Sequence, residues 1–433
     1  MNVLKIILKK SVGQESYEKL RNWYWRFKKR NVFIRIINRF EKYLLLSVVY
    51  PVIYWWCSRH PLNNDKVLMI EPSHPFSNNY YLLYNTLSQN YTFDLHIHLL
   101  RQVSVSKHEY RKRCISLIRD MATARYVFID EGCNALGRIR FRPETQIIQI
   151  WHACGAFKRF GFSTAELLFG STRKEMVKYP YYKYCTTVSV SSPEVIWAYS
   201  EAMGIEQSKI LPLGVSRTDV FFDRSFTEKA RKKLYSLIPS SNGKKIILFA
   251  PTFRGRIAKA TTSTLFSVPE FFRAFSEEYI LLIKHHPHVK TPPVIQKEYE
   301  QFALDVSNIM DIEELLCVAD ICISDYSSLI FEYALFERPM LFFAYDLDEY
   351  FDWRGFYYNY DELTPGPVLK TNEEMINYIK QIDKCFDKKR VVEFKNKYMS
   401  SCDGHCTERI LNHVFGAALS SHQKISAKLE SGL

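Results

Sequence analysis

WHACGAFK (residues 151–158) leaves the end of the apolar, strand-like run 147–151, and SDYSS (residues 324–328) leaves the end of a second such run much later in the chain. In an open α/β sheet, ligand-binding groups lie outside the carboxyl ends of the strands. The first segment supplies a histidine and a lysine at that position, and the second supplies hydroxyl groups where a helix begins. The pair predicts two α/β lobes that face one cleft, with a base on one wall and a phosphate-binding site on the other.

Strand-like and helix-like runs alternate along most of the chain, which is the pattern of a parallel sheet covered on both faces. Strands are expected at 67–71, 93–99, 126–129, 147–151 and 187–190, and then at 246–251, 280–284, 321–324 and 340–345. Helices are expected near 79–89, 108–123, 193–203, 268–278, 312–319 and 329–336. Two consecutive βα series of this length predict an α/β protein with two Rossmann-like lobes. The length of 433 residues also exceeds the size at which one core usually keeps growing.

The expected division has three parts. Residues 1–60 form a basic amphipathic segment, residues 61–225 the N-terminal lobe, and residues 226–433 the C-terminal lobe with its final helices. The segment LPLGV (residues 211–215) breaks the first series, so the boundary falls between Pro212 and Lys244. The tail beyond Asn372 predicts three helices, and we expect the last of them to cross back over the first lobe.

The net charge of +13 is concentrated at the N-terminus, because residues 1–43 contain twelve Lys and Arg against three Glu. A nucleic-acid-binding domain would spread or stripe such charge over its fold, so nucleic acid is not an expected partner. Aromatic and aliphatic residues lie among these basic residues, which is typical of a helix on an anionic membrane surface. The sequence therefore predicts an anionic membrane surface as a partner.

LLLSVVYPVIYWWC (residues 44–57) is an apolar run of fourteen residues, short of the ~20 that a membrane-spanning helix needs. We expect an interfacial or re-entrant anchor and a peripheral protein on the cytoplasmic face of the membrane. The alternative is a helix that packs on the protein's own core. A cleaved signal peptide is not expected, because the apolar run begins late and no small-residue cleavage site follows it.

Ten cysteines at irregular spacing, with no CxxC pair, predict a reduced, cytoplasmic chain. In CDGHC, Cys402, His405 and Cys406 could bind zinc, but no obvious fourth ligand lies nearby, and the start of a helix is the main expectation. In KHHPH (residues 284–288), three histidines also suggest a metal, but further ligands are again lacking. We expect neither a metal nor a cofactor.

His152 is the candidate base of the first lobe. It follows a buried strand, and histidine can take a proton from an attacking hydroxyl near neutral pH. The alternative is a histidine satisfied by backbone carbonyls. Lys158 and Arg159 follow in the same segment and are placed to meet an anionic substrate on the acceptor side.

The second lobe supplies candidate phosphate ligands. Arg254, in APTFRG (residues 250–255), suits a bidentate grip on phosphate oxygens, and Lys284 ends the next strand. The hydroxyls of Ser327 and Ser328, with the free N–H groups of the following helix, would form an anion site; alternatively, Ser327 only caps the helix. Glu332 lies about one turn into that helix and could reach ribose hydroxyls.

These pieces, in this order, resemble the CDP-glycerol glycerophosphotransferase family, which includes teichoic-acid primases, teichoic-acid polymerases and related capsule enzymes. The resemblance covers about residues 67–368. The matching motifs are WHACGAFKRFG (151–161), GVSRTD (214–219), APTFRG (250–255), His286-Pro287, the segment from SDYSS to the proline of a following strand (324–339), and TPGP (364–367). Ala153 departs from the family pattern, which has glycine there, and its methyl group would alter the acceptor pocket.

The resemblance implies a two-lobed GT-B fold. The arrangement of candidate residues does not require a metal for the reaction. Glycerol phosphate or ribitol phosphate would pass from a CDP-activated donor to a hydroxyl of a lipid-linked or polymer acceptor at the membrane, releasing CMP, in teichoic-acid or capsule synthesis. The resemblance implies that His152 is the base, and that His286, the second catalytic candidate, contacts the nucleotide phosphates together with Arg254. It also implies that Ser327 and Ser328, on a turn supported by Asp325, bind the pyrophosphate. Two alternatives stay open, a GT-B glycosyltransferase that uses a sugar nucleotide and a non-catalytic membrane scaffold.

Overall fold

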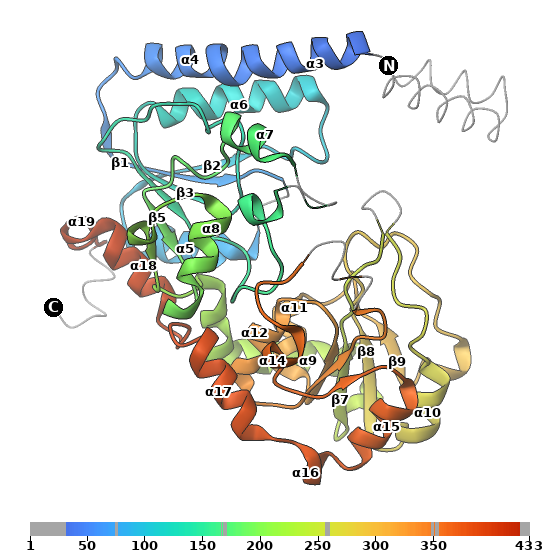
Figure 1. Ribbon diagram of the computed structural model, residues 1–433. Coiled ribbons are helices and arrows are strands. Elements are labelled where there is room, and N and C mark those ends of the chain that lie inside the picture. The colour runs from blue at the N-terminus through green and yellow to red at the C-terminus, as the bar shows by residue number, and fades with distance from the viewer. Residues whose placement is uncertain are drawn as a thin grey trace, which may run out of the picture.

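The computed structural model describes residues 32–73, 77–165, 167, 171–255, 260–347, 350 and 355–424. These residues form two α/β lobes, each built on a six-stranded sheet in which all paired strands are parallel (Figure 1). The expected fold class, two Rossmann-like lobes in a GT-B arrangement, is confirmed. The predictions made for residues 1–31 concern a segment outside the described residues.

The first sheet has the strand order β2-β1-β3-β4-β5-β6. Its strands are β1 (Asn63–Glu71), β2 (Asp94–Leu99), β3 (Ala124–Ile129), β4 (Gln146–Gln149), β5 (Thr187–Ser189) and β6 (Ile210–Leu211). Helices α5 (Asn78–Asn90), α6 (Lys107–Met121), α7 (Arg173–Lys178) and α8 (Ile196–Met203) accompany them. Residues 126–129 of β3 read as a continuous apolar run because all four are buried in the sheet. The sequence did not predict β6, which has two residues and no periodicity.

The second sheet has the order β12-β11-β10-β7-β8-β9. Its strands are β7 (Lys245–Phe249), β8 (Tyr279–Ile283), β9 (Ala303–Asp305), β10 (Ile321–Ser324), β11 (Met340–Phe343) and β12 (Val368–Leu369). Its helices include α9 (Arg224–Leu237), α10 (Val268–Phe275), α11 (Ile312–Val318), α12 (Leu329–Tyr333), α14 (Tyr360–Leu363) and α15 (Asn372–Lys380). The short edge strands β9 and β12 were also missed by the sequence pattern.

The strand orders place one switch point in each sheet, where neighbouring strands are not consecutive in the chain. In the first lobe it lies between β1 and β3, and in the second between β7 and β10. Ligands of open α/β sheets bind at such points, outside the carboxyl ends of the strands. Asp130 follows β3, while Ala250 follows β7 and Asp325 follows β10.

The C-terminal tail joins the lobes. It contains α15, α16 (Ile382–Cys385), α17 (Lys388–Tyr398), α18 (Cys406–Phe415) and α19 (Ala417–Ser421). Helix α18 returns to the first lobe, where it packs beside α5 and adds Val414 and Phe415 to the core under the first sheet (Figure 1). The Asp219 carboxylate accepts the backbone N–H groups of Cys406 (3.0 Å) and Thr407 (2.7 Å) and so caps α18. The helix start expected in CDGHC is therefore present, and the tail contains more helices than the three expected.

The N-terminal part of the described chain is a long helix made of α3 (Val32–Leu44), the π-helical turn η1 (Leu45–Val49) and α4 (Tyr50–Cys57). Tyr50 and Tyr54 are buried where α4 packs on α6, while Trp55 and Trp56 are exposed (Figure 1). The apolar run 44–57 thus covers the lobe with one face and leaves another face uncovered. None of the described helices combines the length and the hydropathy needed to cross a membrane.

Candidate functional site

Two cavities of about 410 Å³ each meet between the lobes. The first is lined by the segment 151–158 of the first lobe, and the second by residues at the carboxyl ends of β7, β8 and β10. Thr252, His286 and Ser328 line both cavities, so the two form one continuous cleft. The structure therefore brings the two segments that the sequence singled out to the same cleft.

A strained turn presents His152 to this cleft. Trp151 has a φ of 55°, a left-handed conformation that is uncommon for a residue with a side chain. The Trp151 ring is held by Phe160, with the ring centroids 4.7 Å apart, and its backbone N–H donates to Oε1 of Gln149 at 3.1 Å. The chain thus turns sharply after β4 and leaves the His152 side chain exposed in the cleft.

The hydrogen bond to His152 fixes which ring nitrogen can act as a base. Nδ1 lies 3.0 Å from the backbone oxygen of Asp130. A carbonyl oxygen only accepts hydrogen bonds, so Nδ1 carries the proton of the neutral ring and Nε2 presents its lone pair. The contact with a backbone carbonyl, which the sequence offered as the alternative to a base, is therefore present, and it orients the ring of this candidate base.

Asp130 supports the candidate site through its contact with His152, and it was not predicted from the sequence. Its side chain is buried, and Oδ2 accepts hydrogen bonds from Oγ of Ser77 (2.9 Å) and Nδ2 of Asn79 (3.0 Å). Burial raises the pKa of this carboxyl group, and nearby His152 opposes the rise. Its position directly after an apolar strand was the signal that could have identified it.

His286 has the opposite hydrogen-bonding arrangement to His152. Its Nδ1 accepts the backbone N–H of His288 at 3.1 Å, so the neutral ring carries its proton on Nε2. The half-buried side chain lines both cavities. Neighbouring His285 is buried, with Nδ1 3.1 Å from Oγ1 of Thr262, and burial lowers the pKa of His285.

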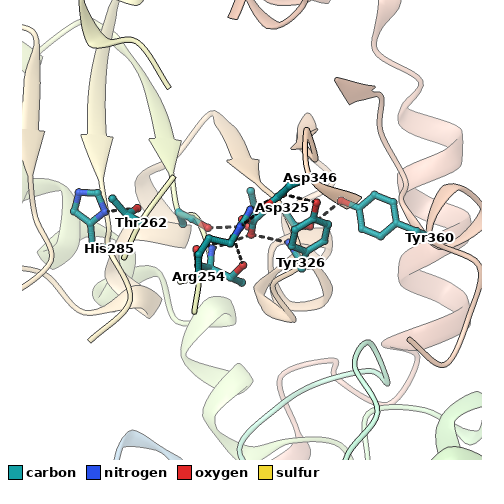
Figure 2. A network of polar contacts seen from close by, with 10 residues as sticks. Arg254, Thr262, His285, Asp325, Tyr326, Asp346 and Tyr360 are labelled. Atoms are coloured by element: carbon teal, nitrogen blue, oxygen red, sulfur yellow. Dashed lines mark hydrogen bonds and ion pairs between the residues drawn. The ribbon is translucent and has the colours of Figure 1, made fainter. Parts of the chain in front are cut away.

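Arg254 pairs with carboxylates on both edges of its guanidinium group (Figure 2). Nη1 donates to Oδ2 of Asp325 at 2.8 Å, while Nε and Nη2 donate to the two carboxylate oxygens of Asp346 at 2.5 and 2.9 Å. These carboxylates raise the pKa of Arg254 against the effect of burial. The phosphate grip predicted for Arg254 stays a prediction, because in this structure Arg254 joins the loops that follow β7, β10 and β11.

The Asp325 carboxylate supports its turn. Oδ1 accepts the backbone N–H groups of Thr252 (2.8 Å) and Tyr326 (2.6 Å), and the backbone oxygen of Asp325 accepts the hydroxyl of Tyr360 (Figure 2). Lys284 has a similar local role, since Nζ donates to the backbone oxygens of Ser307 (2.8 Å) and Met310 (2.6 Å). Burial lowers the pKa of Lys284.

Ser327 and Ser328 both line the second cavity. Oγ of Ser327 accepts the backbone N–H of Leu329 at 3.4 Å, so the capping contact offered as an alternative is present. The helix that follows, α12, has only five residues, so the anion site predicted there would depend on hydroxyl and N–H groups more than on a helix dipole.

Glu332 belongs to a buried ion-pair group that lines the same cavity. It contacts Nη2 of Arg217, whose Nη1 lies 3.7 Å from Oε1 of Glu313. Burial raises the pKa of Glu332 to about 7, while Arg217 opposes the rise. Asn78 of the first lobe donates to Oε2 of Glu313 at 3.2 Å, so the group spans the cleft. Arg217, in the GVSRTD motif, was not among the expected site residues.

The acceptor-side candidates contact the opposite lobe. Lys158 lines the first cavity, with Nζ 5.4 Å from the centroid of the Tyr350 ring. Arg159 is exposed, and its Nε donates to the backbone oxygen of Phe356 at 3.2 Å. Arg159 does not line either cavity. Among the residues that the structure describes, no group of three or more His, Cys, Asp or Glu side chains is placed to hold a metal ion.

Comparisons with known proteins by sequence profile, by sequence identity and by fold all match the chain to related enzymes. A sequence profile of the family described as CDP-glycerol:poly(glycerophosphate) glycerophosphotransferase matches residues 52–416. The teichoic acid poly(ribitol-phosphate) polymerase of Bacillus spizizenii is 33% identical over 392 residues, which is 89% of this chain but 61% of that polymerase. The teichoic acid ribitol-phosphate primase of the same organism is 30% identical over 82% of this chain and 92% of the primase.

Among solved structures, a variant of the wall teichoic acid polymerase TagF soaked with CDPG has the same fold. It aligns with a TM-score of 0.71 at 20% identity, over 89% of this chain and 98% of that chain. The profile match spans most of the chain and includes every motif that carried the resemblance. The chain belongs to the CDP-glycerol:poly(glycerophosphate) glycerophosphotransferase family.

Proposed function

We propose that the protein transfers a polyol phosphate from a CDP-polyol to a hydroxyl group of a membrane-held acceptor, with release of CMP. The observation that carries the proposal is the pair of histidines in one cleft. His152 presents the Nε2 lone pair from the first lobe, and His286 carries its proton on Nε2 in the second. Such a pair offers an acceptor for the attacking hydroxyl and a donor for the phosphates.

We propose that the donor nucleotide occupies the cavity beside Ser327 and Ser328. Its volume of about 410 Å³ lies within the range of small-molecule sites. The hydroxyl of Ser328 and Nε2–H of His286 would donate to the pyrophosphate, and the carboxylate of Glu332 would accept from the ribose. Arg254 and Lys284 would support this site through the loops that they hold.

The reaction then proceeds as one displacement at phosphorus. The acceptor hydroxyl gives its proton to Nε2 of His152 as its oxygen attacks the phosphorus that carries the polyol. A new P–O bond forms, and the bond from that phosphorus to the bridging oxygen of the pyrophosphate breaks. CMP leaves with the bridging oxygen, and His286 stabilises the negative charge that develops there. Lys158 would lie on the acceptor side of the attacked phosphate.

The names of the relatives suggest an order in which to test the candidate donors. The two relatives named above act on ribitol phosphate by name, whereas the family description specifies glycerophosphate. We therefore propose CDP-ribitol as the first donor to test and CDP-glycerol as the second. A sugar nucleotide tests the alternative of glycosyl transfer on a GT-B fold.

The test is turnover with a synthetic lipid-linked acceptor. CMP release from a CDP-polyol, together with an acceptor mass increased by one or more polyol phosphate units, would support the proposal. One added unit would indicate a primase, and a ladder of units a polymerase. Release of UDP from a UDP-sugar with a glycosylated acceptor would replace the proposal, and donor binding without turnover of any donor would indicate a scaffold.

We also propose that the protein is peripheral, on the cytoplasmic face of the membrane. The ten cysteines, with no CxxC pair among them, support a reducing compartment and therefore the cytoplasmic face. The basic residues of the N-terminal segment and the uncovered apolar face of the α3–α4 helix support this placement.

A further inference from the structure

A groove of about 940 Å³ runs between helix α6 and the turn η1, and we call it the α6 groove. Leu45 and Ile115 supply its apolar lining, and Arg111, Lys112 and Arg119 supply cationic groups. The carboxylate of Asp120 also lines the groove, and it is paired with Lys66. Figure 1 shows that α3 and α4 lie along α6 on the outer side of the first lobe. The groove is therefore separate from the cleft between the lobes, which other residues line.

Two of the three cations of the α6 groove are available to a ligand. Arg111 forms an ion pair with Glu41. Lys112 and Arg119 are exposed, and neither forms an ion pair with any residue in the described part of the chain. Together with the hydroxyl of Ser116, they lie at positions i, i+4 and i+7 of one helix and thus form a row along one side of it. Two cations and a hydroxyl group suit a phosphate.

An exposed apolar stripe lies on the neighbouring helix. Its members recur mostly every three to four residues, and we define the stripe as Ile36, Phe40, Leu44, Val48, Val52, Trp55 and Trp56, each more than 40% exposed. The Arg59 guanidinium lies 4.0 and 4.7 Å from the ring centroids of Trp55 and Trp56. Large exposed apolar surfaces mark sites of protein or membrane interaction, and tryptophan with arginine is typical of the membrane interface.

The charges decide which occupant fits. Residues 1–31 contain nine Lys and Arg against two Glu, so this segment of the chain is repelled by a cationic groove. In a symmetric contact with a second copy of the chain, the groove cations of one copy would face the same cations of the other copy and repel them. An anionic phospholipid has a phosphate for the groove and acyl chains for the stripe.

We propose that the α6 groove binds the phosphate headgroup of an anionic phospholipid while the apolar stripe enters the boundary between headgroups and acyl chains. The inference rests on the proposed membrane placement and deepens it, because it states which side of the first lobe faces the bilayer. Headgroup contact by α6 would hold the lobe in one orientation relative to a membrane-held acceptor.

The test is sedimentation of the full-length chain with vesicles of phosphatidylglycerol mixed with phosphatidylcholine, and with phosphatidylcholine alone. The variant Lys112→Gln/Arg119→Gln removes the two cations. The matched control Arg231→Gln/Lys232→Gln removes one Arg and one Lys from exposed positions of α9 in the other lobe. The groove variant should partition to anionic vesicles roughly 30-fold more weakly than wild type, and the control should change little.

A second groove variant tests the proposal independently, in case the first variant does not fold. Ser116→Asp places one negative charge in the groove, and Ser236→Asp on α9 is its exposed control. The first should weaken binding to anionic vesicles and leave binding to phosphatidylcholine unchanged. Equal losses in groove and control variants, or no loss in the groove variants, would overturn the proposal.

Turnover separates this inference from the proposed function. CMP release with a short soluble acceptor should be the same in wild type and in all four variants, because none of the changed residues lines the cleft. If wild type releases no CMP from either CDP-polyol, the proposed function is wrong. The vesicle experiment still tests whether the α6 groove binds a phospholipid headgroup.

Discussion

Replacement of Arg254 by alanine should lower the free energy of unfolding of the second lobe. We expect this loss to exceed the loss in binding free energy of the CDP-polyol. The change leaves two carboxylates without their cation, and the side chains of Asp325 and Asp346 are only 3% and 17% exposed. Removing one partner of a buried ion pair costs about 3–5 kcal/mol. For a domain of this size, 3 kcal/mol lowers Tm by roughly 6–12 °C. Differential scanning calorimetry should show this shift in the transition of the second lobe.

The controls follow from the same contacts. Arg231→Ala removes an exposed arginine of α9 and should leave Tm nearly unchanged. Adding Asp346→Asn to Arg254→Ala should recover part of the loss, because one uncompensated carboxylate is removed. Unchanged Tm in Arg254→Ala, with CDP-polyol affinity weakened by about 1–3 kcal/mol in calorimetric titration, would refute the structural role and would show that the guanidinium binds phosphate directly.

His152→Ala should lower kcat by on the order of 10²-fold with CDP-polyol affinity nearly intact, and wild-type turnover would remove it from the mechanism. The raised pKa of Glu332 contributes stability that is fully present below its ordinary value of 4.5 and is lost as pH rises through about 7. Glu332→Gln should therefore flatten the dependence of Tm on pH across that window, and parallel wild-type and variant curves would contradict this. Gly155→Ala should lower both Tm and turnover, because Gly155 has a φ of 62° and a Cβ there would lie 2.3 Å from the Phe331 ring; a wild-type Tm would argue against this close packing of the lobes. Deletion of residues 1–31 should reduce activity on a vesicle-embedded acceptor far more than on a soluble analogue, whereas equal losses would mean that the segment belongs to the fold.

The sequence was sufficient to predict the lobes and the cleft. Buried parallel strands read as continuous apolar runs, so most strands and their exits could be placed along the chain. All these exits lie at the carboxyl edges of parallel sheets, which is why His152, His286 and Ser328 could be expected to face one cleft. The strands β6, β9 and β12 were missed because two or three residues carry no periodicity.

The partners of the charged residues could not be read from the sequence. A cation after a strand can bind a ligand phosphate or a carboxylate of its own chain, and the residue type is the same in both cases. The partners Asp346 for Arg254 and Glu332 for Arg217 come from loops and helices far away in the chain. The protonated nitrogen of His152 likewise depends on the backbone oxygen of Asp130, which only the pairing of β3 with β4 brings within 3.0 Å. Local pattern determined which residues reach the cleft, and tertiary packing decided which of them hold the site together, because hydrogen bonds and ion pairs depend on distances that the folded chain alone sets.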